Sequence, residues 1–149
     1  MNQSYAVRQT PKRPPLKGKP LPDLAAMDLG GEACPPGKPV LLCLFDLDQR
    51  PSRRVVKQLA DQHDALRQKG LTVLGLQAAI TTADSFKEWK AANPVPFPIG
   101  RVVEKADKTK WASDADSLPW LILTDGDRRV TAEGFALDEL EAKLKGPAK

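Results

Sequence analysis

Hydrophobic residues along this chain occur in short continuous runs that alternate with stretches of helical spacing. The runs 40–45 and 71–76 are almost entirely apolar, which is typical of strands buried on both faces of a parallel sheet. Between them, residues 51–69 repeat hydrophobic side chains at helical spacing, with charged side chains on the other faces. The pattern over residues 40–76 therefore predicts a strand–helix–strand unit with parallel strands.

The long helix of this unit has start and stop signals. Asp48 precedes it and is the expected N-cap, and Pro51 suits the first turn, where a missing N–H costs nothing. At the other end, Lys69 supplies a cation and Gly70 tolerates the positive φ that commonly follows a helix. The sequence therefore predicts a helix from Pro51 to Lys69.

Downstream of this unit, the pattern predicts three further helices and two antiparallel strands, the helices at 82–92, 102–111 and 138–145 and the strands at 120–124 and 128–135. The N-cap of the last helix is expected near Leu137-Asp138. The three prolines of residues 93–98 require an extended or turning segment, which can add a strand, and Asp125-Gly126-Asp127 favours a hairpin turn. The order predicts an α/β fold with a central mixed sheet and helices on both faces.

Composition excludes several classes of protein. The 149 residues, 41% of them hydrophobic, suit one domain, and no apolar run reaches the roughly 18–20 residues of a membrane-spanning helix. The N-terminus lacks the apolar segment of a secretory signal. Two cysteines are too few for a disulfide scaffold or a cysteine zinc site, and the single histidine, His63, is expected to be a half-buried helix residue. We therefore expect no metal and no cofactor.

The charge of the chain is unevenly distributed. Residues 1–20 hold five basic side chains, several prolines and no acidic side chain, whereas the other 129 residues hold 18 basic and 19 acidic side chains. Residues 1–20 are therefore expected to be a disordered basic leader or linker, and residues 21–146 the folded domain. The nearly neutral domain argues against a nucleic-acid partner. Whether the chain is a module of a longer protein stays open.

Polar residues follow the first predicted strand, where functional groups collect in parallel sheets. Arg50, Arg53 and Arg54 flank the expected helix N-terminus and could hold an anion there, although a solvated basic first turn is the preferred interpretation. Asp46 and Asp48 could pair on a metal, but two carboxylates without a third ligand are weak evidence. We expect Asp48 to serve as the helix cap instead.

Several motifs occur in an order that is similar to one family. Leu21-Pro22-Asp23-Leu24 opens the region, Gly37-Lys38-Pro39 precedes the first strand, and Leu118-Pro119 precedes a later strand and the hairpin at 125–130. Together they resemble thioredoxin-like redoxins, above all the TlpA-type and AhpC/TSA-type branch, over about residues 20–145. The resemblance implies a thioredoxin-like fold in which the Leu118–Pro119 bond is cis and lies opposite the turn after the first strand.

One departure from this family removes its chemistry. Where the family carries Cys-x-x-Cys, this chain has Gln49-Arg50-Pro51-Ser52. Dithiol exchange needs a thiolate at the helix N-terminus and a second thiol that resolves the mixed disulfide. An amide and a hydroxyl provide neither, and the peroxidatic cysteine of the AhpC/TSA type is also absent from this turn. The resemblance therefore implies the fold without the activity.

We therefore expect a redox-inactive interaction or scaffold module for a protein or peptide segment. The candidate binding residues follow the family's substrate groove and are Gln49, Arg50, Pro51, Ser52, Leu118, Pro119 and Trp120. The backbone before the proline would pair with an extended segment, and Trp111 and Trp120 would add apolar surface. The alternative, in which the proline loop serves only the fold and the tryptophans belong to the core, stays open.

The competing hypothesis is a thiol–disulfide oxidoreductase or peroxidase that uses a non-standard cysteine. Cys43 lies in mid-strand and is expected to be a buried small hydrophobic residue. Cys34 lies in a proline- and glycine-rich loop and is the accessible candidate, while a Cys34–Cys43 disulfide would be hard to close. The default compartment is the cytoplasm, whereas TlpA-type relatives usually work outside the cytoplasmic membrane.

Overall fold

The computed structural model describes residues 16–21, 37–79, 81–102, 110–113 and 118–145. Cys34, residues 1–15 of the expected leader, most of the motif Leu21-Pro22-Asp23-Leu24 and most of the short helix expected at 102–111 lie outside these ranges. No helix within the described ranges is both long and apolar enough to cross a bilayer.

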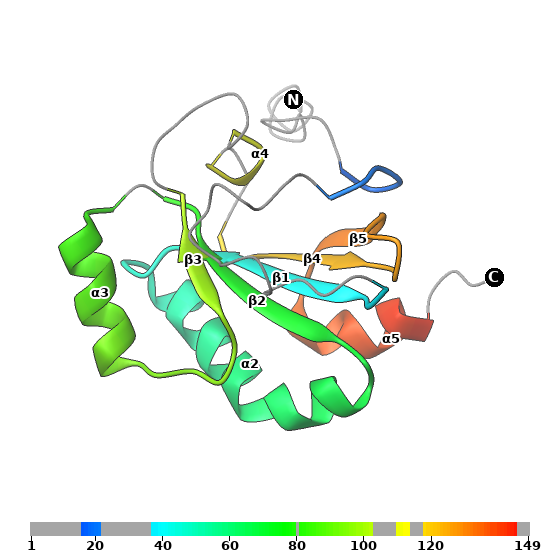
Figure 1. Cartoon of the computed structure of the whole chain (residues 1–149), viewed down its shortest axis with the longest axis horizontal. Helices are drawn as coiled ribbons and strands as arrows, with labels where there is room; N and C mark the ends of the chain where they lie inside the picture. The colour runs from blue at the N-terminus through cyan, green and yellow to red at the C-terminus, as the bar shows by residue number, and fades with distance from the viewer. Residues whose placement is uncertain (1–15, 22–36, 80, 103–109, 114–117, 146–149) are drawn as a thin grey trace, which may run out of the picture.

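A five-stranded mixed sheet in the order β3-β2-β1-β4-β5 forms the centre of the molecule (Figure 1). Its strands are β1 (Val40–Phe45), β2 (Thr72–Gln77), β3 (Ile99–Arg101), β4 (Trp120–Thr124) and β5 (Val130–Phe135). The first three are parallel to one another, and β4 is antiparallel to both β1 and β5. All six residues of β1 are buried because this strand has neighbours on both sides and helices on both faces.

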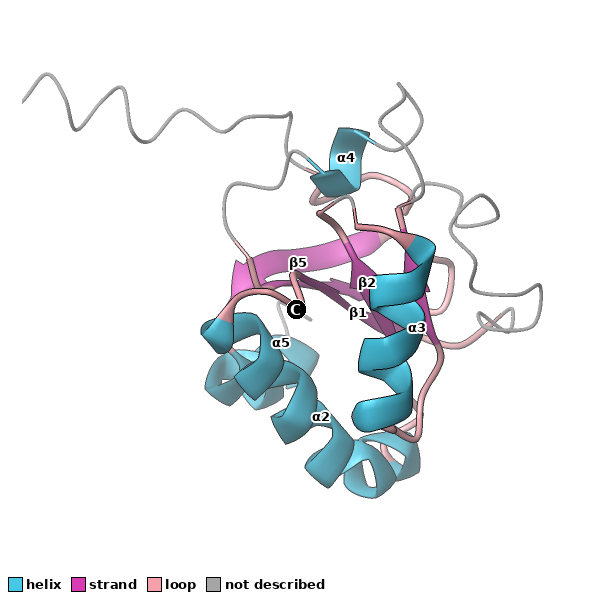
Figure 2. Ribbon diagram, turned by 90° about the vertical axis from the view of Figure 1, so that its left-hand side faces the viewer, coloured by secondary structure: helices cyan, strands magenta, loops and turns pink. Residues whose placement is uncertain are grey.

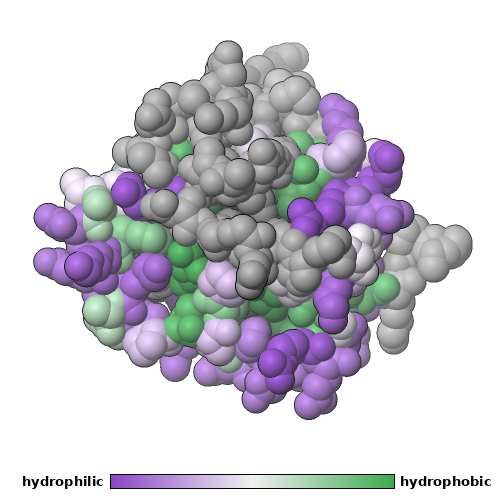
Figure 3. Space-filling view, viewed as in Figure 1, coloured by the Kyte–Doolittle hydropathy of each residue, from purple (hydrophilic) through white to green (hydrophobic). Residues whose placement is uncertain are grey.

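The helices lie on both faces of the sheet, as the pattern predicts. Figure 2 shows α2 (Arg50–Gln68), α3 (Ala83–Ala92) and α5 (Leu140–Lys145) on one side, and α4 (Lys110–Ser113) on the other. Alternate residues of β1 face the two layers. Cys43 and Phe45 pack in the cluster with α2, while Leu42 and Leu44 pack with Trp111. Figure 3 shows hydrophilic side chains along the exposed sides of α2 and α3.

The start of α2 differs from the prediction. The N-cap is Gln49, which has extended backbone angles and makes no capping bond through its side chain, so the prediction of Asp48 as N-cap is wrong. Asp48 lies one residue too early because the backbone N–H of Gln49 donates to the carbonyl of Asp46 at 2.9 Å and closes a turn ahead of the helix. The predicted end is confirmed, since Lys69 is the C-cap and Gly70 follows with a φ of 88°.

The C-terminal hairpin and helix also begin away from their predicted positions. Strand β5 starts at Val130 because Arg128 still belongs to the turn, with a φ of 67° and an N–H that donates to the Asp125 carbonyl at 3.0 Å. The last helix begins with a 3₁₀ turn at Leu137–Glu139, and its N-cap is Ala136, the residue just before the expected Leu137-Asp138. The Glu139 carboxylate accepts the Ala136 N–H at 2.8 Å, which fixes this earlier start.

Residues 16–21 lie along the free edge of β5. The N–H of Gly18 donates to the Val130 carbonyl and the N–H of Val130 donates to the Lys19 carbonyl, both at 2.8 Å. The buried Leu16 donates its N–H to the Glu133 carboxylate at 2.6 Å. Residues 16–20 are expected from the sequence to belong to the disordered leader, whereas these bonds join them to β5. The division into leader and domain otherwise stays a prediction.

Substitution of Gly134 tests how closely side chains pack at this edge of the sheet. This glycine is the extra residue of a β-bulge between the pairs Leu121–Phe135 and Ile122–Glu133, and its φ is 75°. A Cβ atom added there would lie 2.7 Å from the ring of Trp120. Gly134→Ala should therefore lower the free energy of unfolding by about 3 kcal/mol, because left-handed strain and a steric clash add together.

The matched control is Gly70→Ala, at a φ of 88° with no atom within 4 Å of the added Cβ. It should cost about 1–2 kcal/mol, the strain alone. Urea unfolding measures both variants. Equal losses would contradict the close packing of Trp120 against the bulge.

Candidate functional site

The turn between β1 and α2 is organised by Asp46. One carboxylate oxygen of Asp46 accepts the backbone N–H of Asp48 at 3.0 Å, and the other accepts the side-chain amide of Gln49 at 3.2 Å. The carboxylate is thus hydrogen-bonded within its own turn. Within the described part of the chain, no three His, Cys, Asp or Glu side chains gather at metal-binding distance.

Gln49 and Ser52, at the two expected cysteine positions, have different environments. Gln49 is exposed, whereas Ser52 is fully buried. The Ser52 hydroxyl accepts the backbone N–H of Asp46 at 3.1 Å, which ties the first turn of α2 to the end of β1. The residue at the second cysteine position is therefore a structural hydrogen-bonding group.

Gln77 holds the turn from the neighbouring strand, a role that the sequence analysis missed. It ends β2, pairs in register with Phe45 and is 1% exposed. Its side-chain oxygen accepts the Leu47 N–H at 2.8 Å, and its amide donates to the Ala79 carbonyl at 2.9 Å and to the Asp46 carboxylate at 3.4 Å. A polar residue that ends a buried apolar strand is the sequence signal that points to this role.

The Leu118–Pro119 bond is cis, as the resemblance implies. In the β1–β4 register Trp120 pairs with Leu44, so Pro119 lies beside the carboxyl end of β1, where α2 begins. Leu118, Pro119 and Trp120 are all half-buried. We refer to the turn 46–52 together with Leu118–Pro119 as the site edge.

Several solved structures share the overall fold of this chain. A thioredoxin-like superfamily protein aligns with a TM-score of 0.67 and 20% identity over 89% of this chain and 94% of its own. The thioredoxin domain of a thiol-disulfide oxidoreductase from Bacteroides vulgatus aligns with a TM-score of 0.61 and 19% identity over 73% and 78% of the two chains. A putative thiol:disulfide interchange protein DsbE from Chlorobium tepidum gives 0.58 and 20% over 74% and 77%. The chain has a thioredoxin-like fold.

Sequence comparison adds nothing to this assignment, since no protein-family model and no curated protein matches the chain. At 19–20% identity the structural likeness establishes the thioredoxin-like fold alone. The chemistry of this thioredoxin-like chain therefore has to be argued from its own residues.

Cys43 lies in the middle of β1 of this thioredoxin-like fold, is 0% exposed and is a free thiol. Burial raises its pKa to about 12, because the apolar surroundings disfavour the thiolate. Its expected role as a buried small residue is confirmed. At neutral pH it is protonated and out of reach, so it cannot serve as the nucleophile.

The two tryptophans expected near the site have separate roles. Trp111 is buried in the core cluster on the α4 face and is not a surface of the site edge. Trp120 is half-buried and donates its indole N–H to the Glu133 carboxylate at 3.1 Å. His63 is half-buried on α2, with its ring centroid 5.9 Å from that of Phe97, as expected for a packed helix residue.

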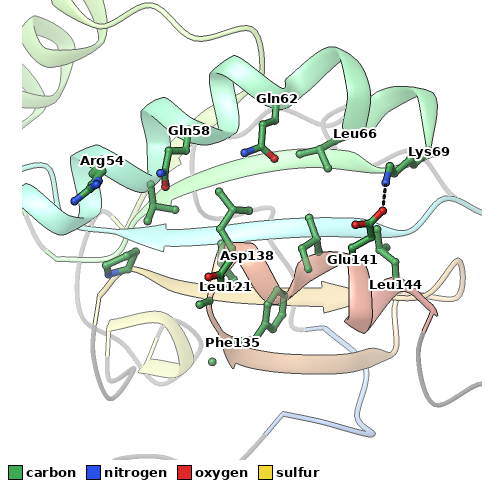
Figure 4. Close-up of a pocket in the computed structure, with 16 residues that line it drawn as sticks. Arg54, Gln58, Gln62, Leu66, Lys69, Leu121, Phe135, Asp138, Glu141 and Leu144 are labelled. Atoms are coloured by element: carbon green, nitrogen blue, oxygen red, sulfur yellow. Dashed lines mark ion pairs between the residues drawn. The ribbon is translucent and has the colours of Figure 1, made fainter.

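A groove that Pro119 helps to line runs along α2 (Figure 4). Its volume is about 750 Å³, and it lies between α2 and the segment formed by the 3₁₀ turn and α5. Leu121 and Phe135 contribute to its floor, and Lys69 and Glu141 approach to 3.6 Å across its far end. This groove, which we call the channel beside α5, thus adjoins the site edge. It has an apolar floor and side chains of both charges along its walls.

The contribution of Gln77 to the site edge can be measured by substitution. Gln77→Met keeps the length of the side chain but removes the partners of the Leu47 N–H and the Ala79 carbonyl. We expect the free energy of unfolding to fall by about 2 kcal/mol, because groups that were paired lose their partners. Urea unfolding is the measurement.

The control is Gln68→Met, at an exposed position at the end of α2. It should change the free energy of unfolding by less than about 0.5 kcal/mol. A loss at position 77 no greater than at position 68 would show that the network does not hold the turn.

Proposed function

We propose that this chain is a redox-inactive thioredoxin-like module that binds a protein or peptide segment at the site edge. The residues that form the binding region are those expected from the sequence, namely Gln49, Arg50, Pro51, Ser52, Leu118, Pro119 and Trp120, with the buried Ser52 in a supporting role. One observation carries the proposal: the turn and the proline loop lie together at the carboxyl edge of the sheet, while the buried position in the turn holds a hydrogen-bonded serine.

The residues of the site edge divide into two roles. Gln49 and Arg50 are exposed and available for contact with a partner, whereas Ser52 holds the turn from within. The backbone of Leu118 is suited to pair with an extended segment, as a sheet edge pairs with an added strand. This mode needs main-chain hydrogen bonds and no covalent step. The occupant we propose is a polypeptide rather than a nucleic acid or a membrane.

A second candidate function is thiol–disulfide exchange, which the names of several structural neighbours favour. Those names describe the neighbours, and the two positions that would carry the exchange here are Gln49 and Ser52. With Cys43 buried and protonated, the second candidate requires Cys34 as the nucleophile. The compartment expected from the sequence, cytoplasmic by default or extracytoplasmic by resemblance, stays a prediction.

Insulin reduction by dithiothreitol, together with peroxide consumption, separates the two candidates. The wild-type chain should show no turnover above the uncatalysed background, because the start of α2 carries no thiol. Turnover that disappears in Cys34→Ser would overturn the binding proposal in favour of the second candidate.

The matched positive control is the double variant Gln49→Cys/Ser52→Cys. It should gain reductase activity, because the N–H groups at the start of α2 stabilise a thiolate at position 49. A folded double variant without activity would indicate that the site edge lacks the geometry on which the binding proposal depends.

Binding at the proline loop is tested with peptides selected from a random display library on the wild-type chain. The variant Leu118→Arg places a long charged side chain beside Pro119 and should weaken the selected peptides by about tenfold or more, since extended pairing there is blocked. Fluorescence anisotropy gives the Kd.

The control is Ala65→Arg, which adds the same side chain at an exposed position in the second half of α2. It should leave the Kd within about twofold of wild type. Equal weakening in both variants, or in neither, would contradict binding at the site edge.

A further inference from the structure

A second groove lies between α2 and α3 and is separate from the channel beside α5. Its volume is about 590 Å³. Figures 1 and 2 both show the two helices side by side on the same face of the sheet. Its floor and far wall are mainly apolar, with Val56, Ala60, Trp89, Pro94 and Val95 among the lining residues. We call it the α2–α3 groove.

The wall of this groove that α2 provides is strongly basic. Arg50, Arg53, Arg54 and Lys57 all line it and are all exposed, and Asp61 is the acidic residue among the lining side chains. Arg53 donates to the Leu47 carbonyl at 3.0 Å. The side chains of the other three cations have no hydrogen-bond or ion-pair partner among the described residues.

This placement of charge is unfavourable for the free protein. The first two turns of α2 carry four cations, near the positive end of the helix dipole. The first turn contains no acidic residue that would offset them. Their mutual repulsion adds to that effect. A bound anionic group would relieve both, because it would interact favourably with the cations and with the positive end of the helix dipole.

The floor of the groove favours a peptide over a bare anion. The Trp89 ring packs on Phe45 with 5.4 Å between centroids, and its indole N–H is buried with no acceptor among the described residues. This apolar surface beside a basic wall is suited to a segment that combines acidic and apolar side chains. Arginine also binds carboxylates through paired hydrogen bonds.

The dimensions favour a short extended segment. Arg50 and Lys57 are separated by about 10 Å along the helix axis at roughly 1.5 Å per residue, which equals about three residues of extended chain at roughly 3.3 Å each. A nucleic acid would require a basic stripe that continues beyond one groove. Outside residues 1–20, the chain instead balances 18 basic against 19 acidic side chains.

We propose that the α2–α3 groove binds an acidic peptide segment, with carboxylates on Arg50, Arg54 and Lys57 and an apolar side chain on Trp89. The inference rests on the proposed function, since it names the chemistry of the polypeptide partner. Arg50 belongs to both the site edge and the groove, so one segment can contact both.

The test uses a fluorescein-labelled peptide of about nine residues in which Glu-Asp pairs flank a central leucine, and an isosteric Gln-Asn peptide. The acidic peptide should bind the full chain and weaken as salt rises, and the neutral one should not bind. Arg54→Glu/Lys57→Glu should weaken it by about tenfold or more, because reversed charges repel it. An unlabelled acidic peptide should change the tryptophan fluorescence, and that change should be lost in Trp89→Phe.

The matched control is Arg67→Glu/Lys143→Glu, which makes the same change in net charge at exposed positions outside the groove. It should keep the Kd within about twofold. Equal weakening in both double variants, no binding of the acidic peptide, or tighter binding of a single-stranded oligonucleotide would each overturn the inference. The library peptides show whether the proposed function fails together with the groove inference. If they still lose affinity in Leu118→Arg, binding at the site edge stands without the groove. If they do not, the proposed function is contradicted as well.

Discussion

The connection between β1 and α2 depends on a small set of hydrogen bonds around Asp46. Its backbone N–H is held by Ser52, its carboxylate is bonded by Asp48 and Gln49, and Gln77 joins it to β2. These bonds pair polar groups at the point where a fully buried strand reaches the surface. They also fix the direction in which α2 leaves the sheet, and therefore the position of both grooves that flank it.

The same bonds explain how the site edge is maintained without sulfur. A reactive thiol at a helix N-terminus must remain accessible and partly ionised. Here the buried position instead holds Ser52, whose hydroxyl accepts a backbone N–H, and the exposed position holds Gln49, whose amide returns to Asp46. Both side chains are engaged in shaping the turn. The two positions where the family carries cysteines thus hold side chains that shape the edge.

Much of the fold could be predicted because it follows from apolar runs and helical spacing. The buried strands, the long helix and its end at Gly70 all have local signals of this kind. The errors fall where a particular hydrogen bond, rather than the residue pattern, decides the outcome. Asp48 has the right residue type for a cap, but the turn closed by Asp46 places Gln49 at that position. The role of Gln77 depends on a neighbouring strand, which the local pattern does not reveal.

A binding module without a covalent step must obtain its affinity from contact alone. Pairing along one short backbone segment at Leu118 gives few contacts and little selectivity, since main-chain hydrogen bonds are the same for every sequence. Selectivity therefore requires side-chain contacts next to the site edge. The structure provides two such surfaces, a mixed-charge channel beside α5 and a basic groove beside α3, and Arg54 lines both. Because the first turns of α2 lie between them, the exposed cations there are well placed to select among segments that the proline loop would bind alike.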